Sequence, residues 1–426
     1  MKKTSPQEIF RNMSSRPYSF FLDSATCHSK ISRYSLMGSD PFLVFKSKKD
    51  SIILEWSDGR TERVRANPFV VLKDILKNYK SKRGAAVGYF GYDMKDFIEK
   101  LPDVARDDIG IPDCIVGFYH KIHVYDKLRM DTSDQDIDNA PILKTPALKS
   151  NFSKEEYIKA INRAKEYIRR GDIYQVNLSQ RFESRLDMDP YELYLRLRNF
   201  SPAPFSSYLN FGDCNVISSS PERFLMKRGS YIETRPIKGT SPRSADPVMD
   251  EFNRNELVKS YKDRAEHIMI VDLERNDLGR LCEYGSVKPT EFIKLEKYST
   301  VFHLVSTVSG KLKRKIDAID CLMATFPGGS ITGAPKIRSM EIIEELEPVK
   351  RSIYTGAIGY ISFDGNMDTS IAIRTIVVKG KKLYFQVGGG IVYDSDPEKE
   401  YSETLDKARG MMRAIGVESE EEALAI

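Results

Sequence analysis

The sequence predicts an α+β fold in which large antiparallel sheets are flanked by helices. Short apolar or alternating segments, separated by turn residues, recur in neighbouring groups along the chain, as strands of antiparallel sheets do. Helical patterns do not alternate one by one with these strands, which argues against a doubly wound parallel sheet. With 426 residues, 41% of them hydrophobic, the chain is expected to form two domains or one large intertwined one.

Composition excludes several classes of protein. Lysine and arginine total 66 against 61 acidic residues, so the basic excess is small and does not indicate a nucleic-acid partner. No apolar run approaches the roughly 20 residues of a membrane span, and the opening MKKTSPQEIF lacks the apolar stretch of a signal peptide. The five cysteines are scattered without a CxxC pair, which argues against a zinc site or disulfide framework. We expect a cytoplasmic protein without membrane or nucleic-acid partners.

The first third of the chain is strand-rich. SIILEW, FVVL, AAVGYFGY and CIVGFYHKIHVY all read as strands. The polar, proline-bearing segment 131–151 has no periodicity, as expected of a linker. We therefore expect an N-terminal strand-rich region (1–150) packed on a main domain (151–418), followed by a short tail (419–426).

The main domain opens with a helix and a strand. Ser153 and Glu156 form a capping box, and apolar residues at helical spacing follow until Gly171. In the next segment, DIYQVNLSQRF, alternation places Gln175, Asn177 and Ser179 on one face of a strand. This polar face indicates a wet cavity or solvent.

Further elements follow the same two periodicities. Strands are predicted at SSYLNF, NVISSS, RGSYIET, YTGAIGYISF, IAIRTIVVKG and KLYFQVGGG. Helices are predicted at 249–271, 315–326, 335–346 and 397–415.

Two pairs of acidic residues have helical spacing. Asp263 with Glu266, and Glu400 with Glu403, each project from one helix face. Taken alone, each pair is more often a solvated face. If the pairs meet, they form an all-oxygen site that suits Mg²⁺. Lys407 is either an i,i+4 partner of Glu403 or a substrate contact.

Three further residues have both a structural and a functional interpretation. Glu222 ends an apolar strand, where its carboxyl either has a raised pKa or lies in a surface turn. His303 alternates with apolar neighbours, and a lone strand histidine is more often structural. Arg374 lies in an apolar segment and should pair with a buried anion, from the protein or from a substrate.

Glycine and proline mark three turn-like segments. In PIKGT, Pro236 and Gly239 bracket Lys238, so the backbone must turn there. FPGGSITGAPK lacks the lysine directly after the second glycine that a phosphate-binding Walker motif needs. The triple glycine 388–390 is interpreted as a bend in preference to an anion site. No GxSxG elbow and no cysteine elbow of a glutamine-hydrolysing enzyme is present.

Eight motifs in order resemble one enzyme family. They are SPERF (220–224), PIKGT (236–240), AEHIMIVDLERNDLGR (265–280), GAPK (333–336), YTGAIGY (354–360), IRT (373–375), GGGIV (388–392) and ETLDKA (403–408). This set, over about residues 153–415, resembles the chorismate-utilising enzymes: anthranilate synthase component I, aminodeoxychorismate synthase component I, and the isochorismate and salicylate synthases.

The resemblance implies a role for each candidate residue. Glu266 and Glu403 match the family's Mg²⁺-binding glutamates, accompanied by Asp263 and Glu400. Glu222 matches the acid that protonates the departing C4 hydroxyl of chorismate, and His303 a histidine near the pyruvyl side. The positions that match substrate-binding residues are Tyr354, Arg374, Gly389, Lys407, Thr332 and Gly333.

Two positions separate branches of the family. Isochorismate and salicylate synthases carry a water-activating lysine where this chain has Gln175, so water attack at C2 loses its base. Anthranilate synthases read PIAGT, whereas aminodeoxychorismate synthases read PIKGT as here. The resemblance is therefore closest to aminodeoxychorismate synthase component I, in which Lys238 would add to C2 of chorismate before ammonia attacks C4.

The same resemblance implies partners and alternatives. Nitrogen would come from glutamine through a separate amidotransferase subunit, and 4-amino-4-deoxychorismate would serve 4-aminobenzoate and folate synthesis. The alternative enzyme is anthranilate synthase component I, and the alternative class is a non-catalytic binding protein. In FFLDSA, Asp23 and Ser24 stand where relatives that bind tryptophan have Glu-Ser, so tryptophan is a candidate ligand there.

Overall fold

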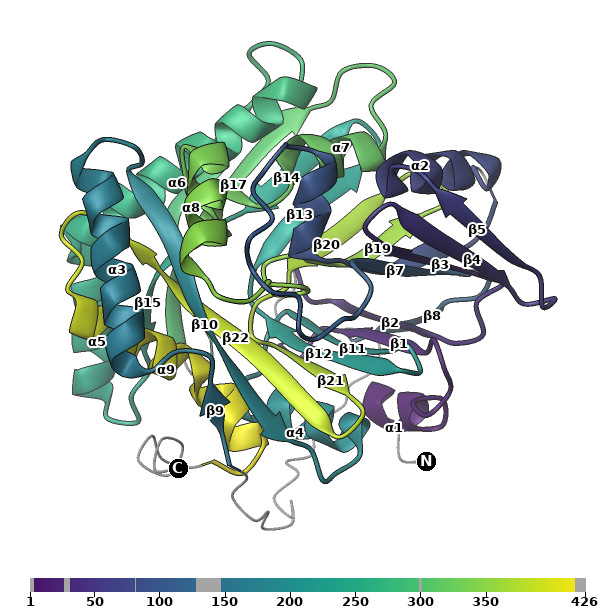
Figure 1. Cartoon of the computed structure of the whole chain (residues 1–426), viewed down its shortest axis with the longest axis horizontal. Coiled ribbons are helices and arrows are strands. Elements are labelled where there is room, and N and C mark those ends of the chain that lie inside the picture. The colour runs from purple at the N-terminus through teal and green to yellow at the C-terminus, as the bar shows by residue number, and fades with distance from the viewer. Residues whose placement is uncertain (1–3, 27–30, 81, 128–146, 299–300, 418–426) are drawn as a thin grey trace.

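The computed structural model describes residues 4–26, 31–80, 82–127, 147–298 and 301–417. Within these ranges the strands form two large sheets, one 10-stranded and one 12-stranded, whose neighbouring strands are antiparallel. Helices lie against the sheets (Figure 1). The predicted α+β class with large antiparallel sheets is confirmed. No helix of the described residues is long and apolar enough to cross a membrane.

The first sheet carries the long strand pair at the centre of the molecule. Its order is β18 (Gly333–Ala334), β10 (Gln175–Arg185), β22 (Lys382–Ile391), β21 (Thr375–Lys379), β12 (Cys214–Ser220), β11 (Phe205–Asn210), β1 (Phe20–Asp23), β2 (Tyr34–Gly38) and β8 (His123–Asp126), with β9 (Lys149–Ser150) beside β10.

The second sheet contains the segment around Lys238. Its order is β15 (Ile237–Pro242), β17 (Val301–Lys311), β14 (Tyr231–Arg235), β13 (Arg223–Arg228), β20 (Met367–Ile371), β19 (Ala357–Ser362), β6 (Ala85–Phe90), β7 (Cys114–Tyr119), β3 (Leu43–Lys48), β4 (Ser51–Trp56) and β5 (Thr61–Arg65), with β16 (Lys288–Lys297) beside β17.

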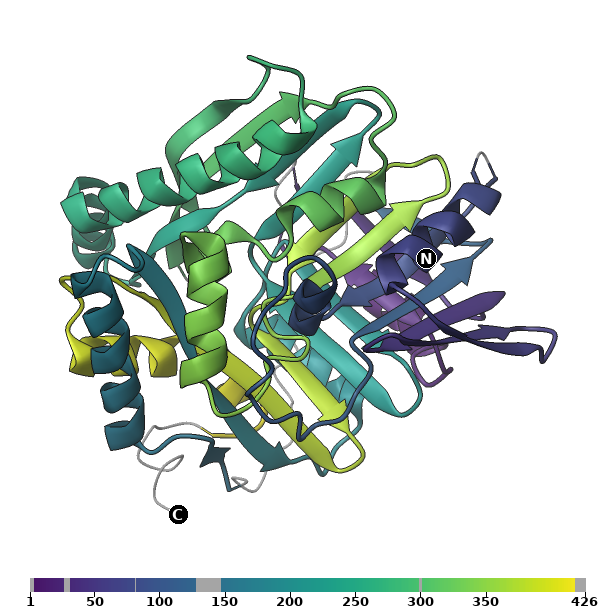
Figure 2. The same ribbon diagram turned by 45° about the horizontal axis from the view of Figure 1, so that its top comes forward.

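The helices cover the sheets from outside. They are α1 (Pro6–Arg11), α2 (Pro68–Asn78), α3 (Lys154–Arg169), α4 (Pro190–Phe200), α5 (Pro247–Lys259), α6 (Tyr261–Leu281), α7 (Ala318–Thr325), α8 (Lys336–Leu346) and α9 (Pro397–Ala414), with 3₁₀ turns η1 (Tyr92–Phe97) and η2 (Gly329–Ile331). Helix α6 lies along β15 and β17, and α3 packs beside α9 (Figure 2).

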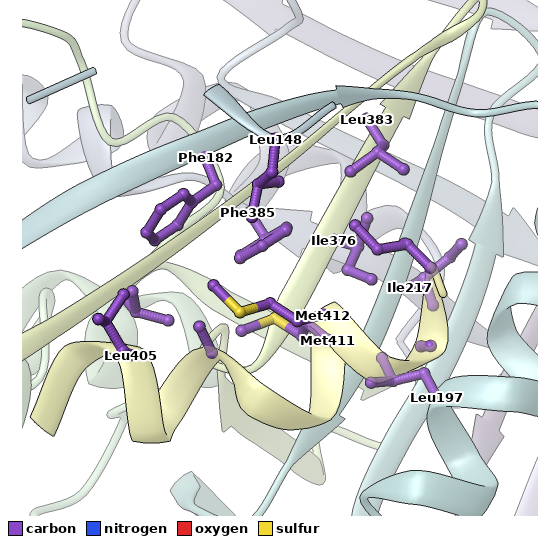
Figure 3. Packing of buried hydrophobic residues seen from close by; sticks show 14 of the residues in the cluster. Leu148, Phe182, Leu197, Ile217, Ile376, Leu383, Phe385, Leu405, Met411 and Met412 are labelled. Carbon is purple, nitrogen blue, oxygen red and sulfur yellow. The ribbon is translucent and has the colours of Figure 1, made fainter. Parts of the chain in front are cut away.

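Three large apolar cores among the described residues hold these layers together. One contains residues of both sheets, such as Phe20 and Val216 from the first and Tyr89 and Ile358 from the second, so the sheets pack face to face. A second core joins the first sheet to its helices, where α9 places Met411 and its neighbours against β21 and β22 (Figure 3). The third joins the second sheet to α2, α6 and α7. Burial of apolar side chains on both faces explains why the strands are so strongly apolar.

The N-terminal region contributes strands to both sheets. Strand β1 pairs with β11, and β6 pairs with β19. The chain from residue 4 to 126 therefore shares its sheets with the later elements. Most of the predicted linker and the whole predicted tail, 419–426, lie outside the described residues.

Two predicted elements are wrong in kind or extent. FVVL is the start of helix α2, because Asn67 caps the helix by accepting a hydrogen bond from the backbone N–H of Phe69, and Pro68 occupies the first helical position. The single helix predicted at 249–271 is two helices, α5 and α6. Ser260 separates them with an extended backbone, and its side chain accepts a hydrogen bond from the N–H of Asp263.

The predicted bend at the triple glycine is also wrong. Residues 388–390 continue β22, where Gly388 pairs with Ser179 and Gly390 with Asn177 of β10. A Cβ built on Gly388 would lie 2.6 Å from the carbonyl oxygen of Leu178. Close approach of two strands, and not a turn, is what the glycines permit here.

Candidate active site

Lys238 lies at a bulge near one edge of the second sheet. Strand β15 pairs with β17 at Ile237 and again at Thr240, but the register shifts between them. Gly239 has a φ of +82°, a left-handed conformation that glycine adopts without strain. A bulge re-aims the side chain that it carries. The turn expected around PIKGT is therefore a strand irregularity, and it turns Lys238 toward α6.

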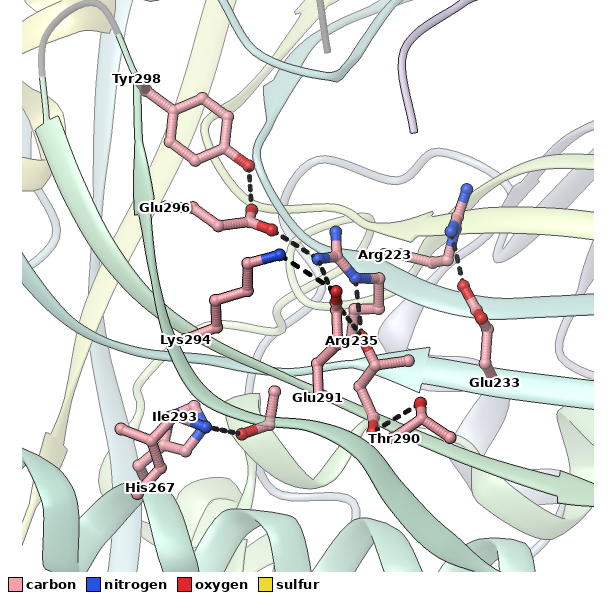
Figure 4. Close-up of polar contacts among 12 residues, drawn as sticks. Arg223, Glu233, Arg235, His267, Thr290, Glu291, Ile293, Lys294, Glu296 and Tyr298 are labelled. Carbon is pink, nitrogen blue, oxygen red and sulfur yellow. Dashed lines mark hydrogen bonds and ion pairs between the residues drawn. The ribbon is translucent and has the colours of Figure 1, made fainter. Parts of the chain in front are cut away.

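Buried polar contacts fix the strand that leads to this bulge. Arg235 donates to the side chains of Glu296 at 2.6 Å and Thr307 at 3.0 Å (Figure 4). The hydroxyl of Tyr298 donates to the other oxygen of Glu296 at 2.7 Å. Arg235 and Glu296 are both less than 10% exposed, so these buried contacts fix the end of β14, three residues before Lys238.

The acidic residues of α6 and α9 come together around lysines. Nζ of Lys238 lies 3.1 Å from Oε2 of Glu266. Nζ of Lys262 lies 4.0 Å from Glu266 and 3.6 Å from Glu400, so this one ammonium group joins the two helices. Nζ of Lys407 lies 2.7 Å from Oε1 of Glu403. The two acid pairs predicted from helical spacing thus face the same region.

Glu400 and Glu403 lie in environments that shift their pKa values in opposite directions. Burial raises the pKa of Glu400, whose carboxyl accepts a hydrogen bond from Ser395 at 2.6 Å. The Lys407 ammonium lowers the pKa of Glu403. Gly389 lies beside both, since a Cβ built on it would be 3.2 Å from Oε2 of Glu400 and 3.9 Å from Oε1 of Glu403. Asp263 packs against the bulge, 3.2 Å from a Cβ built on Gly239.

These carboxylates have the chemistry of a hard-cation site. Oxygen donors suit Mg²⁺, and Glu266, Glu400 and Glu403 converge from two helices. Lysine ammonium groups lie beside these acids, and in the described part of the chain no three His, Cys, Asp or Glu side chains form a group that could hold a metal ion. The donor set fits Mg²⁺, and binding of the ion stays a prediction.

Glu222 lies in the short connection between β12 and β13. Its side chain is 4% exposed. Oε1 accepts hydrogen bonds from the hydroxyl of Ser330 at 2.6 Å and the backbone N–H of Ile237 at 3.4 Å. Burial raises the pKa of Glu222 to about 7, although Ser330 and the nearby Lys238 charge oppose the rise. A carboxyl that is half protonated at neutral pH can act as a general acid.

Arg374 and Tyr354 lie near the same glycine-rich strand. Arg374 is between β20 and β21, with a φ of +51°, and is not inside a strand as the sequence suggested. Nη1 donates to the carbonyl of Lys407 at 2.5 Å, and burial lowers the pKa of its guanidinium to about 10. No carboxylate among the described residues pairs with it. Tyr354 places its hydroxyl 3.0 Å from a Cβ built on Gly388.

His303 is a neutral side chain on β17. Its Nδ1 lies 2.9 Å from Oγ1 of Thr240, its strand partner at the point where pairing of β15 with β17 resumes after the bulge. Burial lowers the pKa of His303 to about 4, with the Arg374 charge acting in the same direction. The imidazole is therefore uncharged at neutral pH.

Thr332 and Gly333 support the site's framework. Thr332 donates its hydroxyl to the carbonyl of Gly328 at 2.9 Å. Gly333 has a φ of +146°, and a Cβ built there would lie 2.2 Å from the carbonyl oxygen of Gln175. Both residues thus fix the edge pairing of β18 with β10, and a direct substrate contact stays a prediction.

Two polar groups of the site were missed or only partly foreseen. Both the amide nitrogen and the amide oxygen of Gln175 are buried without a hydrogen-bond partner among the described residues. A Cβ built on Gly390 would lie 2.5 Å from Nε2 of Gln175 and 2.6 Å from Nζ of Lys238, so the amide and the ammonium flank one point. Ser330, which reaches Glu222, had no signal beyond its place in a glycine-rich segment.

Asp23, where tryptophan was a candidate ligand, lies in the first sheet, and its carboxylate is already bound by the protein. It accepts hydrogen bonds from Ser35, Arg198 and Tyr194 at 2.7, 2.7 and 3.0 Å. Burial alone would raise the pKa of Asp23, but the positive charges of Arg198 and Lys127 outweigh this effect and lower the pKa to about 2. Ser24 donates to the carbonyl of Tyr34 at 3.0 Å.

Comparison with known proteins identifies the family. The family model described as chorismate binding enzyme matches residues 18–413. The chain belongs to the chorismate binding enzyme family. It is 38% identical to anthranilate synthase component 1 of Acetivibrio thermocellus, covering 96% of this chain and 92% of that protein. It is 39% identical to aminodeoxychorismate synthase component 1 of Escherichia coli (strain K12), covering 97% of each.

Solved structures agree on the fold of this chorismate binding enzyme. Anthranilate synthase component I from Streptococcus pneumoniae superposes with a TM-score of 0.78 at 32% identity, over 91% of this chain and 94% of that one. The resemblance noted in the sequence is confirmed. Because relatives of both activities are equally similar overall, individual residues must decide between them.

Proposed function

We propose that this chorismate-utilising enzyme aminates chorismate at C4 to give 4-amino-4-deoxychorismate, through an adduct of Lys238 at C2. The observation that carries the proposal is the bulge in β15, which turns the Lys238 amine toward Glu266 and Gly390. Glu222, the candidate acid, accepts from the backbone N–H of the residue next to Lys238. Nucleophile and acid are thus held by one short segment.

The proposed reaction uses these two groups in order. The Lys238 amine, once its proton has passed to water and its contact with Glu266 is broken, forms a bond to C2. The ring electrons shift, the C4–O bond breaks, and Glu222 donates the proton that lets the hydroxyl leave as water. Ammonia then forms a bond to C4, the electrons return, and the bond between C2 and the lysine nitrogen breaks. The excess proton on the new C4 amine returns to Glu222, and the released lysine regains its proton from water.

Binding of the substrate is assigned to the surrounding charges. Mg²⁺ held by Glu266 and Glu403, with Asp263 and Glu400, would supply positive charge for the ring carboxylate. Arg374, without a carboxylate partner among the described residues, is suited to the remaining carboxylate. Tyr354, Lys407 and the backbone at Gly389 complete the pocket in this proposal.

The nitrogen is proposed to come from glutamine through an amidotransferase subunit. The sequence contains no glutaminase elbow, and the similar proteins are named as component 1 of their synthases. Free ammonia should replace the partner in the test tube. The product would need a lyase to become 4-aminobenzoate for folate synthesis.

Anthranilate synthesis is the second candidate function. The 38% identity to anthranilate synthase component 1 of Acetivibrio thermocellus favours it, and the acid pairs and Glu222 would serve it equally. That reaction releases pyruvate and gives an aromatic amine. Lys238 is the residue that distinguishes the two.

Product analysis tests the proposal directly. The purified chain is incubated with chorismate, Mg²⁺ and an ammonium salt, and products are separated by chromatography and identified by mass. A non-aromatic amine that a lyase converts to 4-aminobenzoate supports the proposal, whereas 2-aminobenzoate with pyruvate overturns it. Lys238→Ala should abolish amination, while Lys259→Ala, at an exposed lysine of α5, serves as the matched control.

The metal and the acid pairs are tested separately. Chelation should abolish turnover and added Mg²⁺ should restore it. Glu266→Gln and Glu403→Gln should each weaken the binding of Mg²⁺. The Mg²⁺ concentration that gives the half-maximal rate should therefore rise in each variant. A chain that only binds chorismate would show no turnover under any of these conditions.

A further inference from the structure

The acidity of Glu222 depends on one short hydrogen bond. Its two donors among the described residues are the hydroxyl of Ser330, at 2.6 Å, and the backbone N–H of Ile237, at 3.4 Å. The second is near the limit of a hydrogen bond, so the first dominates. After burial, which raises the pKa of Glu222, Ser330 is the strongest influence that lowers it. The placement of Ser330 therefore sets how readily Glu222 gives up its proton.

Ser330 is placed by a turn that rests on α6. The turn η2 begins after Gly328, which has no side chain to cap it. Instead, the backbone N–H of Gly329 donates to Oε1 of Glu274 at 3.0 Å. A Cβ built on Gly329 would lie 2.6 Å from Cδ2 of Leu273 and 3.0 Å from Oε1 of Glu274. The turn is thus in direct contact with the helix.

Glu274 has no role in the reaction described so far. It is only 3% exposed, and burial raises its pKa, with neighbouring Asp277 acting in the same direction. Asp277 accepts a hydrogen bond from Nζ of Lys336 at 2.5 Å. Burial raises the pKa of Asp277 too, and the Lys336 ammonium opposes that rise. A buried carboxyl with no role in the reaction calls for a reason.

We propose that Glu274 is a positioning residue for Glu222: it accepts the Gly329 amide hydrogen bond and so fixes the turn that delivers the Ser330 hydroxyl to the Glu222 carboxyl. The role rests on the proposed function of Glu222 as the general acid. Glu274 acts only through Gly329 and Ser330 and touches no reacting atom.

The test measures the titration of Glu222 in the unliganded protein. Infrared difference spectra record the C=O stretch of the protonated carboxyl against pH, and Glu222→Gln identifies its band. Ser330→Ala should raise the pKa of Glu222 by about one pH unit, as expected for one lost hydrogen bond to a charged acceptor. Glu274→Leu, which removes the acceptor of Gly329, should raise it equally, and combining the two variants should raise it no further.

A conservative variant separates positioning from charge. Glu274→Gln keeps an oxygen for the Gly329 amide without a charge and should leave the pKa of Glu222 unchanged. If Glu274→Leu does not fold, Glu274→Asp, whose carboxyl is one methylene shorter, should give the same rise.

Three outcomes would overturn the inference. These are an unchanged pKa in both Glu274→Leu and Glu274→Asp, additive shifts in the double variant, or a fall in the pKa with Glu274→Gln. Since the spectra contain no chorismate, they do not depend on which product the enzyme makes. Failure of the proposed function would appear in the product analysis instead.

Discussion

Substituting Gly390 with alanine should disable the site without unfolding the protein. The added Cβ would lie 2.6 Å from Nζ of Lys238, whereas ordinary contact begins at 3.4 Å. It would also lie 2.5 Å from Nε2 of Gln175. Both atoms are the ends of flexible side chains, so they can move and the fold survives. Lys238 must then retreat by about 0.8 Å, and misplacement of a reacting group by about 1 Å can cost about 10²-fold in rate.

The assay compares turnover of chorismate with stability in Gly390→Ala. We expect kcat to fall about 10²-fold, which corresponds to about 2.7 kcal/mol in activation free energy, with a Tm close to that of the wild type. Gly279→Ala is the matched control, because a Cβ on this exposed glycine of α6 meets nothing within 4 Å. The control should keep full turnover and gain roughly 0.5–1 kcal/mol of stability. Wild-type turnover in Gly390→Ala would refute the placement of Lys238.

Four other predictions follow from the same structure. Turnover should fall as pH rises through about 7, because Glu222 must be protonated to donate its proton. Glu222→Gln should reduce kcat about 10²–10⁴-fold. A flat pH profile of turnover in the wild type would contradict the role of Glu222 as general acid. The raised pKa means that the folded state binds the proton more tightly, so stability falls between pH 4.5 and 7; Glu222→Gln should therefore raise Tm above pH 7. Ser260→Ala, which removes the cap of α6 on the N–H of Asp263, should cost about 1 kcal/mol in urea unfolding, and no change would show that the cap is dispensable. Glu347→Gln leaves the buried Arg351 without its 2.7 Å charge partner and should cost about 3–5 kcal/mol; a loss below about 1 kcal/mol would contradict this estimate.

Local signals in the sequence were reliable where the structure depends on near neighbours. The capping box of Ser153 and Glu156 is present at the start of α3. Helix α9 begins at Pro397, as predicted, and ends at Ala414, one residue before the predicted end. The alternation in β10 placed Gln175 and Asn177 on one face, and that face is buried. Helical spacing also grouped the acids of each helix correctly.

Features that depend on a distant partner could not be predicted. The bulge at Lys238 exists only because β15 pairs with β17, about sixty residues later in the chain, and no local pattern encodes that register. The contact of Ser330 with Glu222 likewise joins two separate loops. The helix starting at Pro68 had a local signal in Asn67-Pro68, but its short apolar run fitted a strand equally well.

The pairing of β6 with β19 has a consequence for how the chain is made. Phe90 leaves the ribosome long before its partner Ala357 exists, and at ~5–20 residues per second the wait is on the order of tens of seconds. During that time the early strands have unpaired edges, which are prone to associate with other chains. Synthesis of this enzyme therefore depends on keeping its first third soluble until the last third arrives, and chaperones that shield exposed strands should raise its yield.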